Sequence, residues 1–175
     1  MSYLTESQIL NFSKDSSLTE SSRYFIKSSS LDVNTTIFLS HSHFDRELAK
    51  NMKIYLSKYR INLYIDWLDN KMPANTNAKT ALELKNKIKS NNYFLLLATN
   101  NALASKWVPW ELGIADGAKS YDNILILPIN DNYGRFNGNE YLQIYKRVEQ
   151  DNLGELGIFE PNKHNGILLE SVLRR

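Results

Sequence analysis

Two tryptophans and a glutamate lie close together in the segment Ser105-Lys106-Trp107-Val108-Pro109-Trp110-Glu111-Leu112-Gly113-Ile114-Ala115. A short apolar run from Tyr93 to Thr99 precedes this segment, followed by a polar turn at Asn100 and Asn101. This order predicts a buried strand and then a helix that begins just beyond the carboxyl end of the strand. Ligands bind at that edge of an open parallel α/β sheet. The segment therefore indicates an α/β fold and the edge of the sheet at which a site is expected.

Glu111 is the candidate for chemistry within this segment. Residues three and four apart on a helix share a face, so Trp107, Trp110 and Glu111 should lie together. Apolar surroundings raise the pKa of a carboxyl group, and flat aromatic walls can hold a ring-bearing substrate between them. A structural alternative stands beside this interpretation, because a glutamate in the first turn also complements the positive end of a helix. Tryptophans at helical spacing are likewise often core or groove-lining residues.

The composition indicates one globular domain and excludes several classes of function. The chain has 175 residues, of which 42% are hydrophobic, which is enough to bury a substantial core. Its net charge of +2 comes from interspersed charges without a basic stripe, so we expect no specific nucleic-acid partner and no membrane partner. The absence of cysteine excludes disulfides, thiolate metal sites and a cysteine nucleophile. The sequence shows no signal peptide and no apolar run near the roughly 20 residues that span a bilayer, so we expect a cytoplasmic protein.

Apolar strands and amphipathic helices alternate along the middle of the chain. Strands are predicted at residues 35–40, 61–66, 93–98 and 124–129. Helices are predicted from Asp45 to residues 58–60, from about 77 to 90, and from 107 to 120. Asp45 is a more natural cap of the first of these helices than a ligand. Such alternation is typical of a doubly wound α/β domain, which is an open parallel sheet with helices on both faces.

The two ends of the chain are less regular than this middle part. Residues 1–33 are polar and serine-rich, and we interpret them as an amino-terminal arm with one or two marginal helices. Residues 34–175 then form the main domain, including a carboxy-terminal helical extension. That extension is expected to contain an amphipathic helix at about residues 140–149 and a terminal helix that ends in Arg174 and Arg175.

Polar residues with binding chemistry follow the first two predicted strands. Ser40, His41 and Ser42 lie at the carboxyl end of the first strand, where hydroxyl groups, an imidazole and loop amides can hold phosphate or ribose. Asp66 and Trp67 begin a long polar loop that reaches about residue 77, which we interpret as a lid. Structural alternatives apply here too. His41 is equally compatible with a turn histidine bonded to the backbone, and Trp67 with a residue that fixes the loop to the core.

Three segments, in this order, resemble the motifs of the Toll/interleukin-1 receptor (TIR) domain family. The segment Ile37-Phe38-Leu39-Ser40-His41-Ser42-His43-Phe44-Asp45 resembles its first-strand box. Tyr64-Ile65-Asp66 and the following loop resemble the second strand and BB loop, and Ser105 to Leu112 resembles the S-x-W-x-x-x-E-L element. The run Asp66-Trp67-Leu68-Asp69 is similar to standalone bacterial members. The resemblance implies a flavodoxin-like TIR fold.

The resemblance also implies an activity. TIR enzymes cleave the bond between nicotinamide and ribose in NAD+ and give nicotinamide plus ADP-ribose or a cyclic ADP-ribose isomer. Their catalytic glutamate corresponds to Glu111. NAD+ is then a substrate, and we expect no separate cofactor and no metal. Some bacterial members belong to antiphage systems such as Thoeris, in which the product activates a separate effector, and family enzymes often complete their site by self-association.

Within that activity each candidate residue has an expected role. Glu111 would bind the ribose and stabilise positive charge in the transition state. Trp107 and Trp110 would stack on nicotinamide or adenine and exclude water, and the access of water would decide between hydrolysis and cyclisation. The long loop contains Pro73 but lacks the Pro-Gly pair of many family members, a difference that bears on the mobility of the lid.

Two other functions fit the same residues. A non-catalytic TIR module would recruit other TIR domains through its lid and helix surfaces, and it would tolerate loss of Glu111. An enzyme like the nucleoside deoxyribosyltransferases would share the α/β sheet and use a glutamate at an anomeric carbon, but on a free nucleoside. A receiver-type phosphoacceptor domain is discounted, because the third predicted strand ends in Ala98-Thr99-Asn100 and not in an aspartate.

Overall fold

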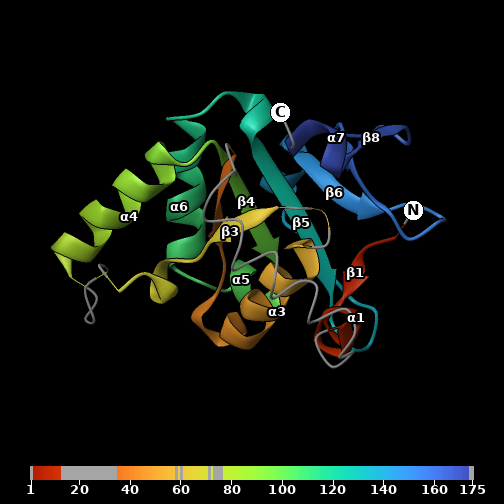
Figure 1. Ribbon diagram of the computed structural model, residues 1–175, viewed down its shortest axis with the longest axis horizontal. Helices are drawn as coiled ribbons and strands as arrows, with labels where there is room; N and C mark the ends of the chain where they lie inside the picture. Colours follow the sequence, from red (N-terminus) through yellow and green to blue (C-terminus); the bar gives the residue numbers. More distant parts are fainter. Residues whose placement is uncertain are drawn as a thin grey trace.

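A single mixed sheet forms the centre of the molecule (Figure 1). The computed structural model describes residues 2–12, 35–57, 59, 61–70, 72 and 77–173. Eight strands form the sheet in the order β3-β2-β4-β5-β6-β7-β8, and β1 also pairs with β5. The strands are β1 (Leu4–Thr5), β2 (Thr36–Ser40), β3 (Asn62–Tyr64), β4 (Tyr93–Ala98), β5 (Ile124–Asn130), β6 (Lys146–Gln150), β7 (Leu156–Phe159) and β8 (Gly166–Leu168). All pairings are parallel except those of β7 with β6 and β8.

Helices cover both faces of this sheet (Figure 1). The α-helices are α1 (Glu6–Phe12), α3 (Arg46–Ser57), α4 (Ala78–Ser90), α5 (Asn100–Leu103), α6 (Trp107–Asp116) and α7 (Leu169–Leu173). Short 3-10 helices are η1 (His43–Asp45), η2 (Asp66–Leu68), η3 (Tyr121–Asn123) and η4 (Glu140–Ile144). α1 and α3 pack together on one face, and α4 and α6 pack together on the other. The predicted α/β class and the placement of helices on both faces are confirmed.

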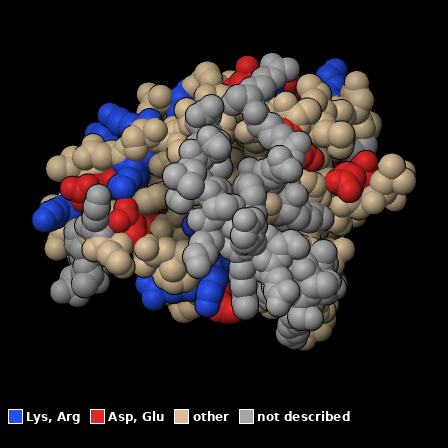
Figure 2. Space-filling model, viewed as in Figure 1, with Lys and Arg blue, Asp and Glu red and all other residues tan. Residues whose placement is uncertain are grey.

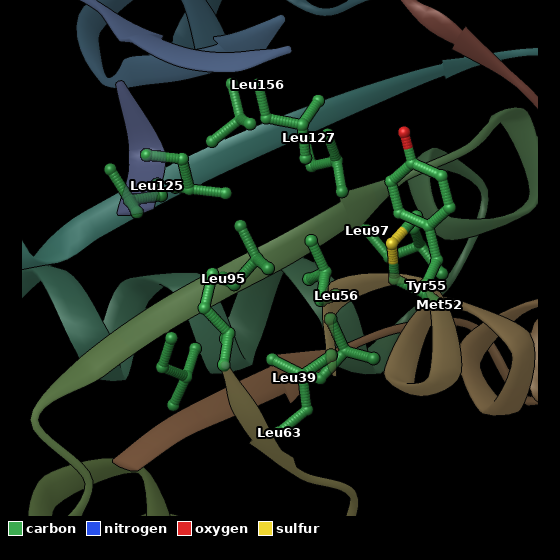
Figure 3. Close-up of a cluster of buried hydrophobic side chains, with 14 of the residues drawn as sticks. Leu39, Met52, Tyr55, Leu56, Leu63, Leu95, Leu97, Leu125, Leu127 and Leu156 are labelled. Carbon is green, nitrogen blue, oxygen red and sulfur yellow. The ribbon is translucent and has the colours of Figure 1, made fainter. Parts of the chain in front are cut away.

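The central strands are apolar at successive positions because they face two cores. Leu95 and Leu97 of β4 point to the α3 side, where Figure 3 shows them with Met52 and Leu56. Phe94 and its alternate neighbours point to the α4 and α6 side. Successive side chains of a strand point to opposite faces, so a strand covered by helices on both sides reads as a continuous apolar run. The predicted third strand is confirmed with the same bounds.

The helices that follow β3 and β4 begin at local capping signals. Asn77 accepts a hydrogen bond from the amide of Thr80 at 3.1 Å, and the Thr80 hydroxyl accepts one from the amide of Asn77, which completes a capping box for α4. Asn100 and Asn101, expected as a turn, instead open the short helix α5, which Thr99 caps. α6 then begins at Trp107 as predicted but ends at Asp116, because Gly117 stands at its carboxyl end.

The described part of the amino-terminal segment belongs to the core of the domain. β1 runs parallel to β5 with Leu4 opposite Ile129, and α1 packs on α3. The side chains of Leu4 and Ile9 are fully buried. The amino-terminal arm is expected to contain one or two marginal helices that pack on the domain or on a partner subunit, and in the described residues the helix α1 packs on α3 of the domain. The expected boundary between residues 33 and 34 lies outside the described residues.

The prediction of an amphipathic helix at about residues 140–149 is wrong. Glu140–Ile144 form only η4, and Lys146–Gln150 form the strand β6. β6 lies parallel to β5 and antiparallel to β7, so its backbone N–H and C=O groups form hydrogen bonds with strands on both sides. In a helix the same groups would bond to one another.

The expected carboxy-terminal helical extension is instead an antiparallel edge of the sheet. The turn between β6 and β7 places Gly154 at a φ of 83°, and the Asp151 carboxylate accepts hydrogen bonds from the amides of Leu153 and Glu155. Only α7 remains of the expected terminal helix, and Arg174 and Arg175 lie outside the described residues. Within the described ranges, no helix has the length and apolar character that crossing a membrane requires.

Candidate functional site

Glu111 lies on the buried face of α6. The Ser105 hydroxyl accepts hydrogen bonds from the amides of Trp107 and Val108 at 3.1 and 3.4 Å, and so holds the start of the helix. One turn later Glu111 faces the sheet, with 7% of its surface exposed. Because no acidic residue stands in the first turn of α6, interaction with the helix dipole does not explain this glutamate.

The carboxyl group of Glu111 meets the end of a central strand. Ser40, the last residue of β2, donates a hydrogen bond from its Oγ to Oε2 of Glu111 at 2.6 Å. Burial raises the pKa of Glu111 to about 8, the hydrogen bond from Ser40 lowers it, and the negative charge of Asp66 raises it. In the free protein this carboxyl group is therefore largely protonated at neutral pH, and a nearby positive charge would favour its ionised form.

His41 connects the end of β2 to the start of the long loop. The indole Nε1 of Trp67 donates a hydrogen bond to Nε2 of His41 at 2.9 Å, and Nδ1 of His41 lies 3.2 Å from the carbonyl oxygen of Leu39. An indole N–H can only donate, so Nε2 carries the lone pair and Nδ1 carries the proton. Burial lowers the pKa of His41, which agrees with a neutral ring. Both structural alternatives, a turn histidine bonded to the backbone and a loop-fixing Trp67, hold in this arrangement.

We expect His41 to hold this single tautomer in solution. A long-range ¹⁵N correlation spectrum at pH 7 should show a protonated Nδ1 and an unprotonated Nε2. Trp67→Phe removes the donor that favours the neutral ring, so the pKa of His41 should rise. The exposed His164 serves as an internal control, and a wild-type spectrum with Nε2 protonated would contradict the assignment.

Glu111, His41 and Trp67 line a common cleft of about 480 Å³, a size within the range of small-molecule sites. Its lining comprises His41, His43, Arg46, Asp66, Trp67, Thr80, Leu84, Ser105, Trp107 and Glu111. The sequence predicts four of these residues as binding residues around Glu111, namely His41, Asp66, Trp67 and Trp107, and the fold brings them to this one cleft. In the described part of the chain, no cluster of His, Asp and Glu has the arrangement needed to hold a metal ion.

Three predicted residues lie outside this lining. Ser40 acts on the cleft only through Glu111. The Ser42 hydroxyl is buried and accepts a hydrogen bond from the amide of Phe44 at 3.3 Å, so it caps η1. Trp110 packs edge-on against Trp107, with ring centroids 5.3 Å apart and an interplanar angle of 88°. One indole of α6 therefore borders the cleft, and the other supports it from outside.

Sequence reasoning missed several residues of the lining: His43, Arg46, Thr80, Leu84 and Ser105. Arg46 follows directly after the first-strand motif and begins α3, which was the available signal. Thr80 lies within the helix predicted from about residue 77, and nothing in the surrounding sequence indicates a binding role for it. It lines the cleft together with Leu84 of the same helix, beside residues distant in sequence such as His41, and local sequence does not encode that relation.

Asp45 has a role other than the expected helix cap. Its buried carboxylate accepts hydrogen bonds from Thr99 Oγ1 at 2.5 Å and from Asn101 Nδ2 at 2.7 Å. Thr99 and Asn101 follow β4, whereas Asp45 follows β2, so the carboxylate joins two neighbouring connections at the carboxyl edge of the sheet. The nearby cap is Ser42, at the start of η1.

The start of the long loop is anchored to α4 and β3. The Tyr64 hydroxyl donates a hydrogen bond to Asp69 at 2.8 Å, and Lys87 of α4 forms an ion pair with the same carboxylate at 2.8 Å. Pro73 and the expected lid around it lie outside the described residues.

Comparison with known proteins identifies the family. Residues 37–156 match the TIR domain family, a range that includes every residue of the cleft lining. Over 119 residues the chain is 34% identical to the probable 3′ cyclic ADP-D-ribose synthase ThsB′ of Bacillus cereus strain MSX-D12. That match covers 64% of this chain and 59% of the relative, which is less than two thirds of the relative's length. The family match agrees with the mostly parallel sheet and with the order of the motifs, and the chain belongs to the TIR domain family.

Proposed function

We propose that this chain cleaves the bond between nicotinamide and ribose in NAD+, with Glu111 as the catalytic residue. The observation that carries the proposal is the buried Glu111 carboxyl group, bonded to Ser40 in a cleft that Trp67 and Trp107 border. NAD+ as the substrate is supported by membership of the TIR family and by the name of the B. cereus relative, a probable cyclic ADP-ribose synthase.

Charge stabilisation is the main task of the site in this reaction. Nicotinamide is cationic in NAD+, so it can leave as a neutral molecule without a general acid. The C1′–N bond breaks, its electron pair stays with nicotinamide, and the ribose becomes an oxocarbenium ion. The ionised Glu111 carboxylate stabilises that ion and binds the ribose hydroxyls. We propose no separate cofactor and no metal, because the substrate brings its own leaving group.

The cationic substrate itself favours the reactive form of Glu111. Burial holds the pKa of this carboxyl group at about 8 in the free protein. A positive charge within a few ångströms favours ionisation and offsets part of the effect of burial. Binding of NAD+ therefore converts a protonated glutamate into the carboxylate that the transition state needs.

The fate of the oxocarbenium ion decides the product. Capture by water gives ADP-ribose and releases a proton, whereas capture by a nitrogen of the adenine or by a ribose hydroxyl of the same molecule gives a cyclic isomer and also releases a proton. We propose the cyclic product, which the name of the B. cereus relative supports, and we infer that the indoles of Trp67 and Trp107 at the cleft keep water from the oxocarbenium ion. We further propose that the product is a signal in antiphage defence read by a separate effector. Self-association and a cytoplasmic location stay predictions from the sequence.

The test is mass-resolved chromatography of NAD+ incubated with concentrated wild-type protein or with Glu111→Ala. We expect only the wild type to release nicotinamide together with a product one water lighter than ADP-ribose. ADP-ribose as the sole product would support cleavage and contradict cyclisation. Base exchange on deoxynucleosides would indicate the transferase alternative. If concentrated wild-type protein turns over neither NAD+ nor deoxynucleosides, the non-catalytic TIR module becomes the better interpretation.

A further inference from the structure

Arg46 brings a permanent positive charge into the Glu111 cleft. It is the first residue of α3, and its exposed side chain lines the cleft together with Trp67 and Glu111. Its guanidinium carbon lies 5.6 Å from the centroid of the Trp67 ring, a distance at which a cation is attracted to the face of an indole. Trp67 is itself fixed by its hydrogen bond to His41. The guanidinium of Arg46 is thus held at the cleft by the ring of Trp67, which His41 holds in turn.

The charges of the lining make this arginine distinctive. Asp66 and Glu111 are the acidic residues of the described lining, and Arg46 is its one side chain with a permanent positive charge. Within the described part of the chain, Arg46 forms no ion pair, and the neighbouring Asp45 carboxylate is bonded to Thr99 and Asn101. Among these described residues, the guanidinium is supported by an aromatic ring and is not paired with a carboxylate. Such a group is available to an anionic ligand.

The wider surface around the cleft favours the same kind of ligand. α4 contributes Thr80 and Leu84 to the lining, and Figure 2 shows basic side chains with a few acidic ones among them on the side of this helix. The exposed surface of this helix, outside the cleft lining, carries Lys79, Lys85 and Lys89, whereas Glu83 is its one acidic residue. A field of this sign attracts an anionic substrate toward the cleft.

We propose that Arg46 binds the pyrophosphate of the dinucleotide substrate, and so places the nicotinamide-ribose bond at Glu111. This inference rests on the proposed cleavage of NAD+ and adds a second point of recognition to it. A planar guanidinium can donate two parallel hydrogen bonds to phosphate oxygens while one face stays on the Trp67 ring. The cleft then distinguishes a nicotinamide dinucleotide from nicotinamide riboside, which has the same scissile bond but no phosphate.

Steady-state kinetics with both substrates tests this assignment. In Arg46→Gln the ratio of kcat/KM for NAD+ to kcat/KM for nicotinamide riboside should fall about tenfold, mainly through KM for NAD+. Arg46→Lys keeps the charge without the planar fork and should recover part of the ratio. Lys50→Gln, on the same helix but outside the cleft lining, is the matched control and should keep the wild-type ratio. An Arg46→Gln effect of equal size on both substrates would mean that Arg46 only supports Trp67, and would overturn the proposal.

Binding of ADP-ribose separates this inference from the proposed reaction. Isothermal titration with ADP-ribose needs no turnover, and its dissociation constant should rise about tenfold in Arg46→Gln but not in Lys50→Gln. If the wild type does not cleave NAD+ but binds ADP-ribose through Arg46, the proposed function fails and the pyrophosphate site stands. If the wild type cleaves NAD+ and Arg46→Gln binds ADP-ribose as tightly as the wild type, the pyrophosphate site fails and the proposed function stands.

Discussion

Glu111→Gln should lower kcat for NAD+ cleavage by at least about 100- to 1,000-fold, the size of effect seen when one charge-stabilising group is removed from an active site. The amide has nearly the same shape as the carboxyl group and can still accept the hydrogen bond that Ser40 donates. It cannot become an anion, so it offers no full negative charge to the oxocarbenium ion. The loss should appear in kcat, because this interaction strengthens only as charge develops in the transition state.

The rate of nicotinamide release under single-turnover conditions, compared between wild type and Glu111→Gln, measures this loss of rate directly. Glu140→Gln is the matched control, because it removes the same charge from an exposed position outside the cleft lining. Circular dichroism and the thermal midpoint establish that the fold is retained in both variants. Retention of more than a tenth of the wild-type kcat in Glu111→Gln would remove Glu111 from the chemical step.

Ser40→Ala removes the hydrogen bond to Glu111 but leaves the carboxyl group in place, so it tests the contribution of this partner separately from that of the charge. The Ser40 hydroxyl lies 2.6 Å from Oε2 of Glu111 and favours the ionised carboxyl group, whereas burial and Asp66 oppose ionisation. Ser40 is therefore a positioning residue that acts through Glu111. Its position at the last residue of a buried strand gives the glutamate a fixed partner, since the backbone of β2 is held by both β3 and β4.

Much of the fold was predictable because its signals are local. β4 is apolar throughout since helices cover both faces of the sheet, and the start of α4 is marked by the Asn77 and Thr80 capping box. Glu111 was identified because its helix follows the carboxyl end of a central strand, a place where parallel sheets carry their sites. In each case the residues that decide the structure are neighbours in the chain.

The features that sequence reasoning missed depend on contacts between distant segments. Lys146–Gln150 has no strong strand pattern, and it becomes β6 because β5 and β7 supply hydrogen bonds on both sides. A turn signal was present at Asp151 and Gly154, but it predicts a hairpin only once β7 is recognised as a partner. Pairing of this kind overrides the local preference of a short polar segment.

The same reasoning applies to the cleft. Trp107 and Trp110 share one side of α6 by their spacing, yet only Trp107 borders the cleft, because the position of η2 and α4 decides which indole is used. Arg46 becomes a candidate for binding only when η2 returns Trp67 to the end of β2. Spacing along a helix predicts which residues share a face, whereas the tertiary fold decides what that face meets.

Glu111→Gln should also stabilise the protein, by an amount that grows with pH. The pKa of Glu111 is raised from 4.5 to about 8 by folding, so between these values the folded state holds a proton that the unfolded state has lost. The free energy of unfolding of the wild type therefore falls as the pH rises from about 4.5 to about 8. Above pH 8 the full cost of a buried carboxylate is present, and it is on the order of a few kcal/mol. Glutamine does not ionise, so Glu111→Gln avoids this cost.

Urea unfolding of both proteins at pH 5, 6.5 and 8.5 measures the effect. The variant and the wild type should differ little at pH 5, and the variant should be the more stable by a widening margin toward pH 8.5. Titrating groups that do not interact with Glu111 are shared, so their contributions cancel in the difference. Asp66, whose negative charge raises the pKa of Glu111, is the group that does interact with it. Glu140→Gln removes one carboxyl group from an exposed position and is the matched control. A gap between Glu111→Gln and wild type that is the same at all three pH values would mean that Glu111 ionises normally in the folded state. In that case the charge it brings to NAD+ would be present before the substrate binds, and ionisation on binding would not be a step of the mechanism.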